Sequence, residues 1–234
     1  MELLDLIALL KRYQHEYSSV VPFNPQMDKL LPFDFSPANK EISEDILGST
    51  EEFTSFINNK LKLSNARYGI GGYNEYREVY SRSKVFDATG VDEEPRRLHL
   101  GTDIWGKPHT PVMAPWDGII HSFAFNNNFG DYGVTIILSH SIAGSGFYTL
   151  YGHLSRNSVK NMYEGDRVCK GDVFAEFGIP AENGHWPPHL HFQIIREIDE
   201  WKGDYPGVCK FSEREKYLMN SPDPDLLLQL NQYL

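Results

Sequence analysis

The chain has little cysteine and little positive charge, and both scarcities limit what it can be. Only two cysteines occur in 234 residues, Cys169 and Cys209, and they form no CxxC pair. The sequence therefore indicates neither a disulfide framework nor a cysteine-rich structural metal site. Lys and Arg number 22 against 32 Asp and Glu, which gives a net charge of -10. Without a basic block, no nucleic-acid partner is expected.

Long apolar runs are also missing. No stretch is long enough to span a bilayer, so we expect no membrane insertion. The chain begins MELLDLIALLKRY, with Glu2 and Asp5 where a signal peptide would carry positive charge, and no small-residue cleavage site follows. These features predict a cytoplasmic protein.

The region before residue 68 is predicted to be mostly helical. Apolar residues recur at helical spacing in the first segment, at Leu3, Leu4, Ile7, Leu10 and Tyr13. A proline-rich loop follows over residues 22–39. Ser43 and Ser49 are both plausible N-caps of a second helix. The apolar stripe of that helix consists of Phe53, Phe56, Ile57, Leu61 and Leu63.

From Tyr68 onward turn residues become frequent and the predicted strands are short. The run YGIGGY (68–73) is interpreted as a bend. Five segments read as strands: Gly118–Phe125, Tyr132–Leu138, Phe147–Leu154, Val173–Phe177 and His189–Ile195. No long helices alternate with them, which favours a mainly β fold over a doubly wound α/β fold.

Three regions are therefore expected. Residues 1–67 form a helical N-terminal extension packed on the core, residues 68–200 form the β domain, and residues 201–234 form a C-terminal extension that ends in a helix. The last helix is predicted from the start signal Asp223-Pro224-Asp225 and from the apolar side that follows it, made of Leu226, Leu227, Leu230 and Leu234.

Two histidines stand in the sequence HLH at positions 189–191. Alternate residues of a strand share one face, so His189 and His191 point the same way, and Gln193 continues that face. Leu190, on the opposite face, can enter the core. Taken alone, the pattern also fits two exposed polar residues on a solvent-facing strand.

A third histidine, His99, lies four residues before Asp103 in HLGTD. In an extended strand the two would be about 13 Å apart, too far to share one ion. We therefore expect a bend, with Gly101 free to adopt a positive φ. Two histidines and one carboxylate are a standard zinc set that leaves a fourth position open, and such open sites are usually catalytic.

Five motifs in order resemble those of the lysostaphin/LytM metallopeptidases. They are HLGTD (99–103), GKPHTPVMAPWDG (106–118), YGHLS (151–155), GDRVCKGD (165–172) and PHLHF (188–192). The resemblance covers roughly residues 98–195, less than half of the chain. It departs from the family pattern at His109, where family members usually have glycine, and it excludes both ends of the chain.

The resemblance implies a fold, a cofactor and roles for five residues. The implied fold is an antiparallel β core of the hybrid barrel-sandwich type, here with helical additions at both ends. His99, Asp103 and His191 match the ligands of one zinc ion, and His153 and His189 match the catalytic pair beside it. Either histidine of that pair could be the general base.

The function implied is that of a zinc metallopeptidase. Zinc would activate a water, assisted by two histidines, for hydrolysis of peptide bonds in peptidoglycan cross-links. One alternative is a cytoplasmic zinc peptidase or amidase with a substrate outside the cell wall. Another is a non-catalytic peptide-binding module on the same fold. The sequence does not determine the oligomeric state.

Overall fold

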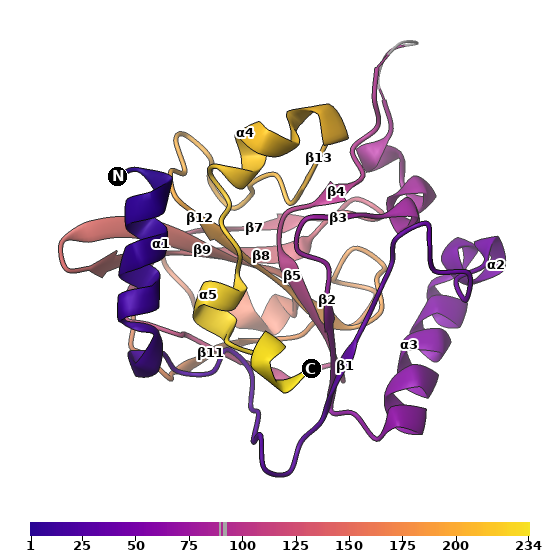
Figure 1. Cartoon of the computed structure of the whole chain (residues 1–234), viewed down its shortest axis with the longest axis horizontal. Coiled ribbons are helices and arrows are strands. Elements are labelled where there is room, and N and C mark those ends of the chain that lie inside the picture. The colour runs from indigo at the N-terminus through magenta and orange to yellow at the C-terminus, as the bar shows by residue number, and fades with distance from the viewer. Residues whose placement is uncertain (89, 91–92) are drawn as a thin grey trace.

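A large mixed β-sheet forms the centre of the molecule (Figure 1). The computed structural model describes residues 1–88, 90 and 93–234. In spatial order the eight strands are β1 (Leu30–Pro32), β2 (Tyr68–Gly71), β5 (Thr102–Trp105), β12 (His189–Ile195), β9 (Ser145–Leu154), β8 (Gly133–Ile142), β7 (Gly118–Asn126) and β10 (Arg167–Val168). Neighbouring strands are antiparallel except β1 and β2, which are parallel. The mainly β class is thus confirmed, and one parallel pair makes the sheet mixed.

Strand β12 shows why the sheet has one apolar and one polar face near its centre. Leu190, Phe192 and Ile194 alternate into the largest hydrophobic cluster of the protein. His189 and His191 alternate to the other face, as the period of two predicts, but both are buried rather than exposed to solvent. The buried histidines therefore lie on a strand whose opposite face packs into the hydrophobic core.

Two small sheets flank the large one. The first pairs β6 (Pro111–Met113) with β11 (Val173–Glu176). The second contains β3 (Glu75–Tyr76), β4 (Leu98–His99) and β13 (Val208–Cys209), with β4 in the middle. This second sheet fixes His99 from both sides, because β4 is hydrogen-bonded to a strand on each edge.

The N-terminal helices lie at opposite ends of the large sheet (Figure 1). Helix α1 (Leu3–Arg12) buries Leu6 and Leu10 in the main cluster. At the other end α2 (Glu44–Gly48) and α3 (Thr50–Ser64) follow each other directly, capped by Ser43 and Ser49 respectively. Both predicted caps are therefore used, one for each of two helices. None of the helices in the described part of the chain has the length and apolar character needed to cross a bilayer.

Several local expectations were wrong. Leu4 is 78% exposed and Leu63 is 85% exposed, so neither belongs to the buried stripe of its helix. Residues 68–71 form strand β2 rather than part of a bend. The C-terminal region has two short helices, α4 (Arg214–Leu218) and α5 (Asp225–Leu228). The second begins at the predicted start signal but is a single turn that ends at Gln229 in the left-handed conformation, so Leu230 and Leu234 lie beyond it.

Candidate metal centre

His99, Asp103 and His191 converge at the point where β4, β5 and β12 meet. Asp103 and His191 are directly opposite each other in the antiparallel pairing of β5 with β12. His99 is brought to them by a bend at residues 100–101, as expected from the four-residue spacing. Gly101 is needed there for space and not for a positive φ, because a Cβ atom at this position would lie 2.5 Å from Cε1 of His191.

The three side chains offer one atom each to a common point. His99 Nε2 lies 2.8 Å from His191 Nδ1 and 3.3 Å from Asp103 Oδ1, and His191 Nδ1 lies 3.2 Å from the same Asp103 oxygen. Tetrahedral ligands of zinc at bonds of about 2.0 Å are separated by about 3.3 Å. Two imidazole nitrogens and one carboxylate oxygen at these separations fit a zinc ion.

Hydrogen bonds on the far side of each ring fix which nitrogen faces this point. His99 Nδ1 donates to the carbonyl oxygen of Gly72 at 2.9 Å. His191 Nε2 donates to Oε1 of Gln193 at 3.0 Å. The amide of Gln193 is itself held, because its Nε2 donates to Ser221 Oγ at 2.9 Å. Such outer partners orient metal ligands and leave the opposite nitrogen unprotonated.

Asp103 is held by an arginine that the sequence analysis did not single out. Arg77 Nη1 lies 2.5 Å from Asp103 Oδ2, and Arg77 Nε lies 2.5 Å from Glu75 Oε2. Both Arg77 and Asp103 are almost completely buried. Oδ2 is thus occupied by the guanidinium, and Oδ1 is left to face the two histidines. No sequence spacing connects Arg77 to Asp103, so no local signal could have identified the pair.

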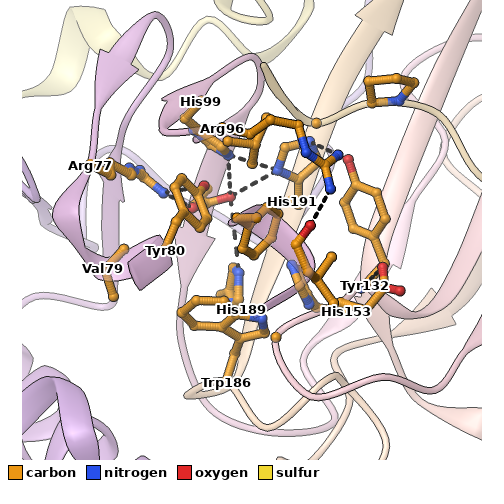
Figure 2. Close-up of a pocket in the computed structure, with 18 of the residues that line it drawn as sticks. Arg77, Val79, Tyr80, Arg96, His99, Tyr132, His153, Trp186, His189 and His191 are labelled. Atoms are coloured by element: carbon orange, nitrogen blue, oxygen red, sulfur yellow. Dashed lines mark hydrogen bonds and ion pairs between the residues drawn. The ribbon is translucent and has the colours of Figure 1, made fainter. Parts of the chain in front are cut away.

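His153 and His189 form a second pair beside these three residues (Figure 2). Their ring centroids are 4.1 Å apart. His153 Nδ1 donates to the Asn183 carbonyl at 2.8 Å, and His189 Nδ1 donates to the Pro187 carbonyl at 2.7 Å. Each ring therefore keeps its Nε2 as a free acceptor, and His189 Nε2 lies 4.0 Å from Asp103 Oδ1.

The backbone at His153 explains how its side chain reaches this position. The pairing of β8 with β9 shifts register between Val134 and Ile136, opposite the segment from Tyr151 to Leu154. His153 has φ 63°, a left-handed conformation that is uncommon for residues other than glycine. Bulges of this kind redirect a side chain and are frequent next to active sites.

Burial controls the protonation of the cluster. It lowers the pKa of His99 to about 3 and that of His189 to about 4. The pKa of His153 is also lowered, first by burial and then by the neighbouring His189. Burial alone would raise the pKa of Asp103, but His99 and Arg77 hold it well below its usual range. At neutral pH His99, His153 and His189 are therefore neutral and Asp103 is ionised, which is the state in which these side chains can bind a metal.

A cavity of about 140 Å³ opens onto both groups of residues. All five side chains singled out in the sequence line it, together with Arg77 and Tyr132. Tyr132 donates to the Tyr205 carbonyl at 3.2 Å, and its ring contacts His153 and His191. Figure 2 shows His99, His189 and His191 turned toward the carboxylate oxygen that carries their dashed lines.

Two curated relatives match part of this chain. An uncharacterized metalloprotease from Haemophilus influenzae is 30% identical over 139 residues, which are 57% of this chain and 27% of that protein. An L-Ala–D-Glu endopeptidase from Bacillus subtilis is 31% identical over 150 residues, which are 60% of this chain and 43% of that protein. The chain spans less than half the length of either relative.

Solved structures also resemble it. The catalytic domain of the antimicrobial peptidase lysostaphin from Staphylococcus simulans matches with a TM-score of 0.43 and 25% identity, covering 75% of this chain and 97% of that one. A zinc-containing peptidase from Vibrio cholerae matches with a TM-score of 0.34 and 28% identity, covering 46% of this chain and 31% of that one. Residues 97–203, which contain all five histidine and aspartate residues of the cluster, match Peptidase family M23. The match to Peptidase family M23 therefore covers the part of the chain that holds the clustered residues, and the rest of the chain lies outside it.

Proposed function

We propose that this protein is a zinc-dependent endopeptidase that hydrolyses peptide bonds in peptidoglycan-type peptides. One observation carries the proposal. The ligand atoms of His99, Asp103 and His191 lie within 4.8 Å of one another, and two further neutral histidines lie beside them. A structural metal site would have no use for that second pair.

His99 Nε2, Asp103 Oδ1 and His191 Nδ1 would hold the ion. When bound, zinc supplies Lewis acidity, which acidifies a water molecule and polarises the scissile carbonyl. Arg77, Gly72 and Gln193 keep the three ligands oriented before any ion arrives, so little reorganisation accompanies binding.

His153 and His189 would move the protons. Each has an unprotonated Nε2 on the cavity side, so either can accept a proton from water and pass it to the departing amine. The ring that has taken up the water proton is positively charged until it passes that proton to the amine, and in this state it can stabilise the negative charge on the carbonyl oxygen. Both Nδ1–H groups donate to backbone carbonyls, and these bonds hold the two imidazoles in fixed orientations during the transfer.

The substrate class rests on the relatives. The Bacillus subtilis relative is named as an L-Ala–D-Glu endopeptidase. We infer from that name that the substrate class of this protein is a peptidoglycan-type peptide. In this proposal residues 68–200 are the catalytic unit, and residues 1–67 and 201–234 are additions packed on it. The cytoplasmic location expected from the sequence stays a prediction, and a substrate outside the cell wall is the alternative that follows from it.

The test measures metal content and turnover together. The full-length protein, loaded with one equivalent of zinc, is incubated with purified sacculi and with a defined peptide library, and products are identified by mass spectrometry. We expect cleavage of one type of peptide bond in both, loss of cleavage with a chelator and recovery with added zinc. Cleavage of library peptides without release from sacculi would support the alternative substrate. No cleavage of either at full zinc occupancy would refute the proposal.

A further inference from the structure

We propose that the cavity beside His153 and His189 is a subsite for one bulky apolar side chain of the peptide substrate, next to the scissile bond. This inference rests on the proposed peptidase function and adds a substrate preference to it. A substrate with only glycine at that position would leave the subsite unfilled.

Aromatic side chains form one side of the cavity. We call the following six residues the aromatic wall: Phe35, Phe53, Tyr80, Phe86, Trp105 and Trp186. All six are buried and belong to one hydrophobic cluster. Their rings contact one another in pairs. The ring centroids are 5.9 Å apart for Phe53 and Trp105 and 4.7 Å apart for Tyr80 and Phe86.

The aromatic wall reaches the proposed catalytic pair directly. Trp105 is stacked on His189, with centroids 3.9 Å apart and ring planes at 17°. Trp186 meets His153 edge to face at 6.3 Å (Figure 2). A substrate side chain that contacts this wall therefore belongs to a residue whose backbone lies at the two histidines.

Four of the six residues lie outside the matched family domain at 97–203. Phe35 comes from the proline-rich loop, Phe53 from α3, and Tyr80 and Phe86 from the segment before β4. Phe35 and Phe53 pack against each other at 5.7 Å, and Phe53 packs against Trp186 at 6.5 Å. The preference would thus be a property of segments that precede the matched residues 97–203, added to the proposed catalytic site.

The size of the cavity fits one side chain. Its volume of about 140 Å³ includes the space at the three ligand atoms. A closed apolar cavity of about 150 Å³ in another protein stays dry and binds benzene. Filling such a space with a leucine or phenylalanine side chain removes apolar surface from water and strengthens binding by roughly 10-fold or more.

Two polar atoms of the wall lack a partner. The indole nitrogens of Trp105 and Trp186 are buried, and within the described residues neither has a hydrogen-bond acceptor. Buried indole N–H groups usually find an acceptor, so two unpaired donors are unusual for a packed aromatic cluster.

The first arm of the test measures kcat/KM for matched peptides. Each peptide differs only in one residue flanking the scissile bond, which is Gly, Ala, Leu or Phe. We expect the wild-type zinc-loaded protein to prefer Leu or Phe over Gly by roughly 10-fold or more on one side of the bond. Equal turnover of all four peptides on both sides would overturn the inference but leave the proposed peptidase function intact.

The second arm fills the cavity. Val85 lines the cavity and is only partly buried. The substitution Val85→Trp therefore adds side-chain volume to the cavity without replacing a fully buried core residue. We expect this variant to lose the preference, so that its kcat/KM for the Leu and Phe peptides is no higher than that for the Gly peptide. The matched control is Val173→Trp, at a residue that is 62% exposed and does not line the cavity. A preference that survives Val85→Trp and matches the control would also overturn the inference.

A binding arm separates the two proposals. Binding of N-acetyl-phenylalanine amide and N-acetyl-glycine amide to the zinc-loaded full chain is measured by calorimetry. Tighter binding of the phenylalanine compound to the wild type, but not to Val85→Trp, supports the subsite. If that result is found and no peptide is cleaved, the proposed peptidase activity is refuted and the subsite is retained. Equal binding of both compounds would overturn the subsite.

Discussion

Arg77 and Asp103 form a buried ion pair, with Nη1 of the arginine 2.5 Å from Oδ2 of the aspartate. The pair joins the turn-rich entry segment before residue 97 to the strand that carries the carboxylate. Burying two charges is costly, and that cost is offset only when geometry and further hydrogen bonds are good. Here Glu75 supplies a second carboxylate to the same guanidinium, so the arginine is held from two sides.

Replacing Arg77 with methionine should destabilise the metal-free protein strongly. The change leaves Asp103 buried without its partner, which typically costs about 3–5 kcal/mol of unfolding free energy. The measurement is a double-mutant cycle with Asp103→Leu by urea unfolding of metal-free protein. We expect the double variant to lose clearly less than the sum of the two single losses. Additive losses would show that the two side chains do not act as a pair.

Replacing Gln193 with leucine should weaken zinc binding and leave the fold intact. The variant removes the acceptor for the His191 Nε2 proton, and such outer-partner changes typically cost about 10- to 100-fold in metal affinity. Competition with a chromophoric chelator measures the affinity. Gln193→Glu retains an acceptor oxygen and should lose less. Unchanged zinc affinity in Gln193→Leu would mean that the proton of His191 has no influence on the site.

The proposed ligand and proton-transfer roles predict different losses. His191→Ala should lose zinc, because it removes a ligand atom. His153→Asn should retain zinc and lose turnover, and asparagine is chosen because it tolerates the left-handed backbone at this position. Metal content is measured by elemental analysis and activity with the cleaved library peptide. Equal loss of zinc in both variants would contradict the assignment of His153.

The elements predicted correctly are those with a local pattern. Strand β12 alternates polar and apolar residues, and β7, β8, β9 and β11 are bounded by turn residues, so their positions could be read from the sequence. Strand β1 could not, because it has three residues and its parallel partner β2 lies more than thirty residues away. Only the tertiary structure makes that segment extended.

The site shows the same division. His189, His191 and Gln193 share a face because the period of a strand requires it, and the four-residue spacing of His99 and Asp103 required a bend if they shared an ion. Arg77 and Tyr132 carry no such signal, since their contacts with the cluster depend on chain segments that meet only in the fold. The bulge at His153 was equally invisible, because nothing in YGHLS marks the extra residue.

The free energy of unfolding should decrease as the pH is lowered, because His140, which lies outside the site, is kept neutral in the folded protein. Burial lowers the pKa of His140 to about 4, whereas an unfolded histidine titrates near 6.5. The contribution is therefore fully present above about pH 6.5 and is lost as the pH falls toward 4, because only the unfolded chain takes up the proton in that range.

The test compares the wild type with His140→Asn, both free of metal, by urea unfolding at pH 7.5 and pH 5.0. The other histidines contribute equally to both proteins and cancel in the difference. We expect the wild type to lose about 2 kcal/mol more than the variant between these two pH values. The same pH dependence in both would mean that His140 is not kept neutral by the fold.

Removing residues 1–67 should destabilise the protein and should not activate it. Leu6, Leu10 and Phe53 are completely buried, so trimming exposes the surfaces that they cover on both ends of the large sheet. Each buried leucine or phenylalanine typically contributes about 2–5 kcal/mol. None of the described side chains before residue 68 lies among the three proposed ligands, and Phe35 and Phe53 form a wall of the cavity rather than a plug.

Thermal unfolding and peptide cleavage are compared for the full-length and trimmed proteins at equal zinc occupancy. A large gain in cleavage on trimming would show instead that the N-terminal region blocks the site.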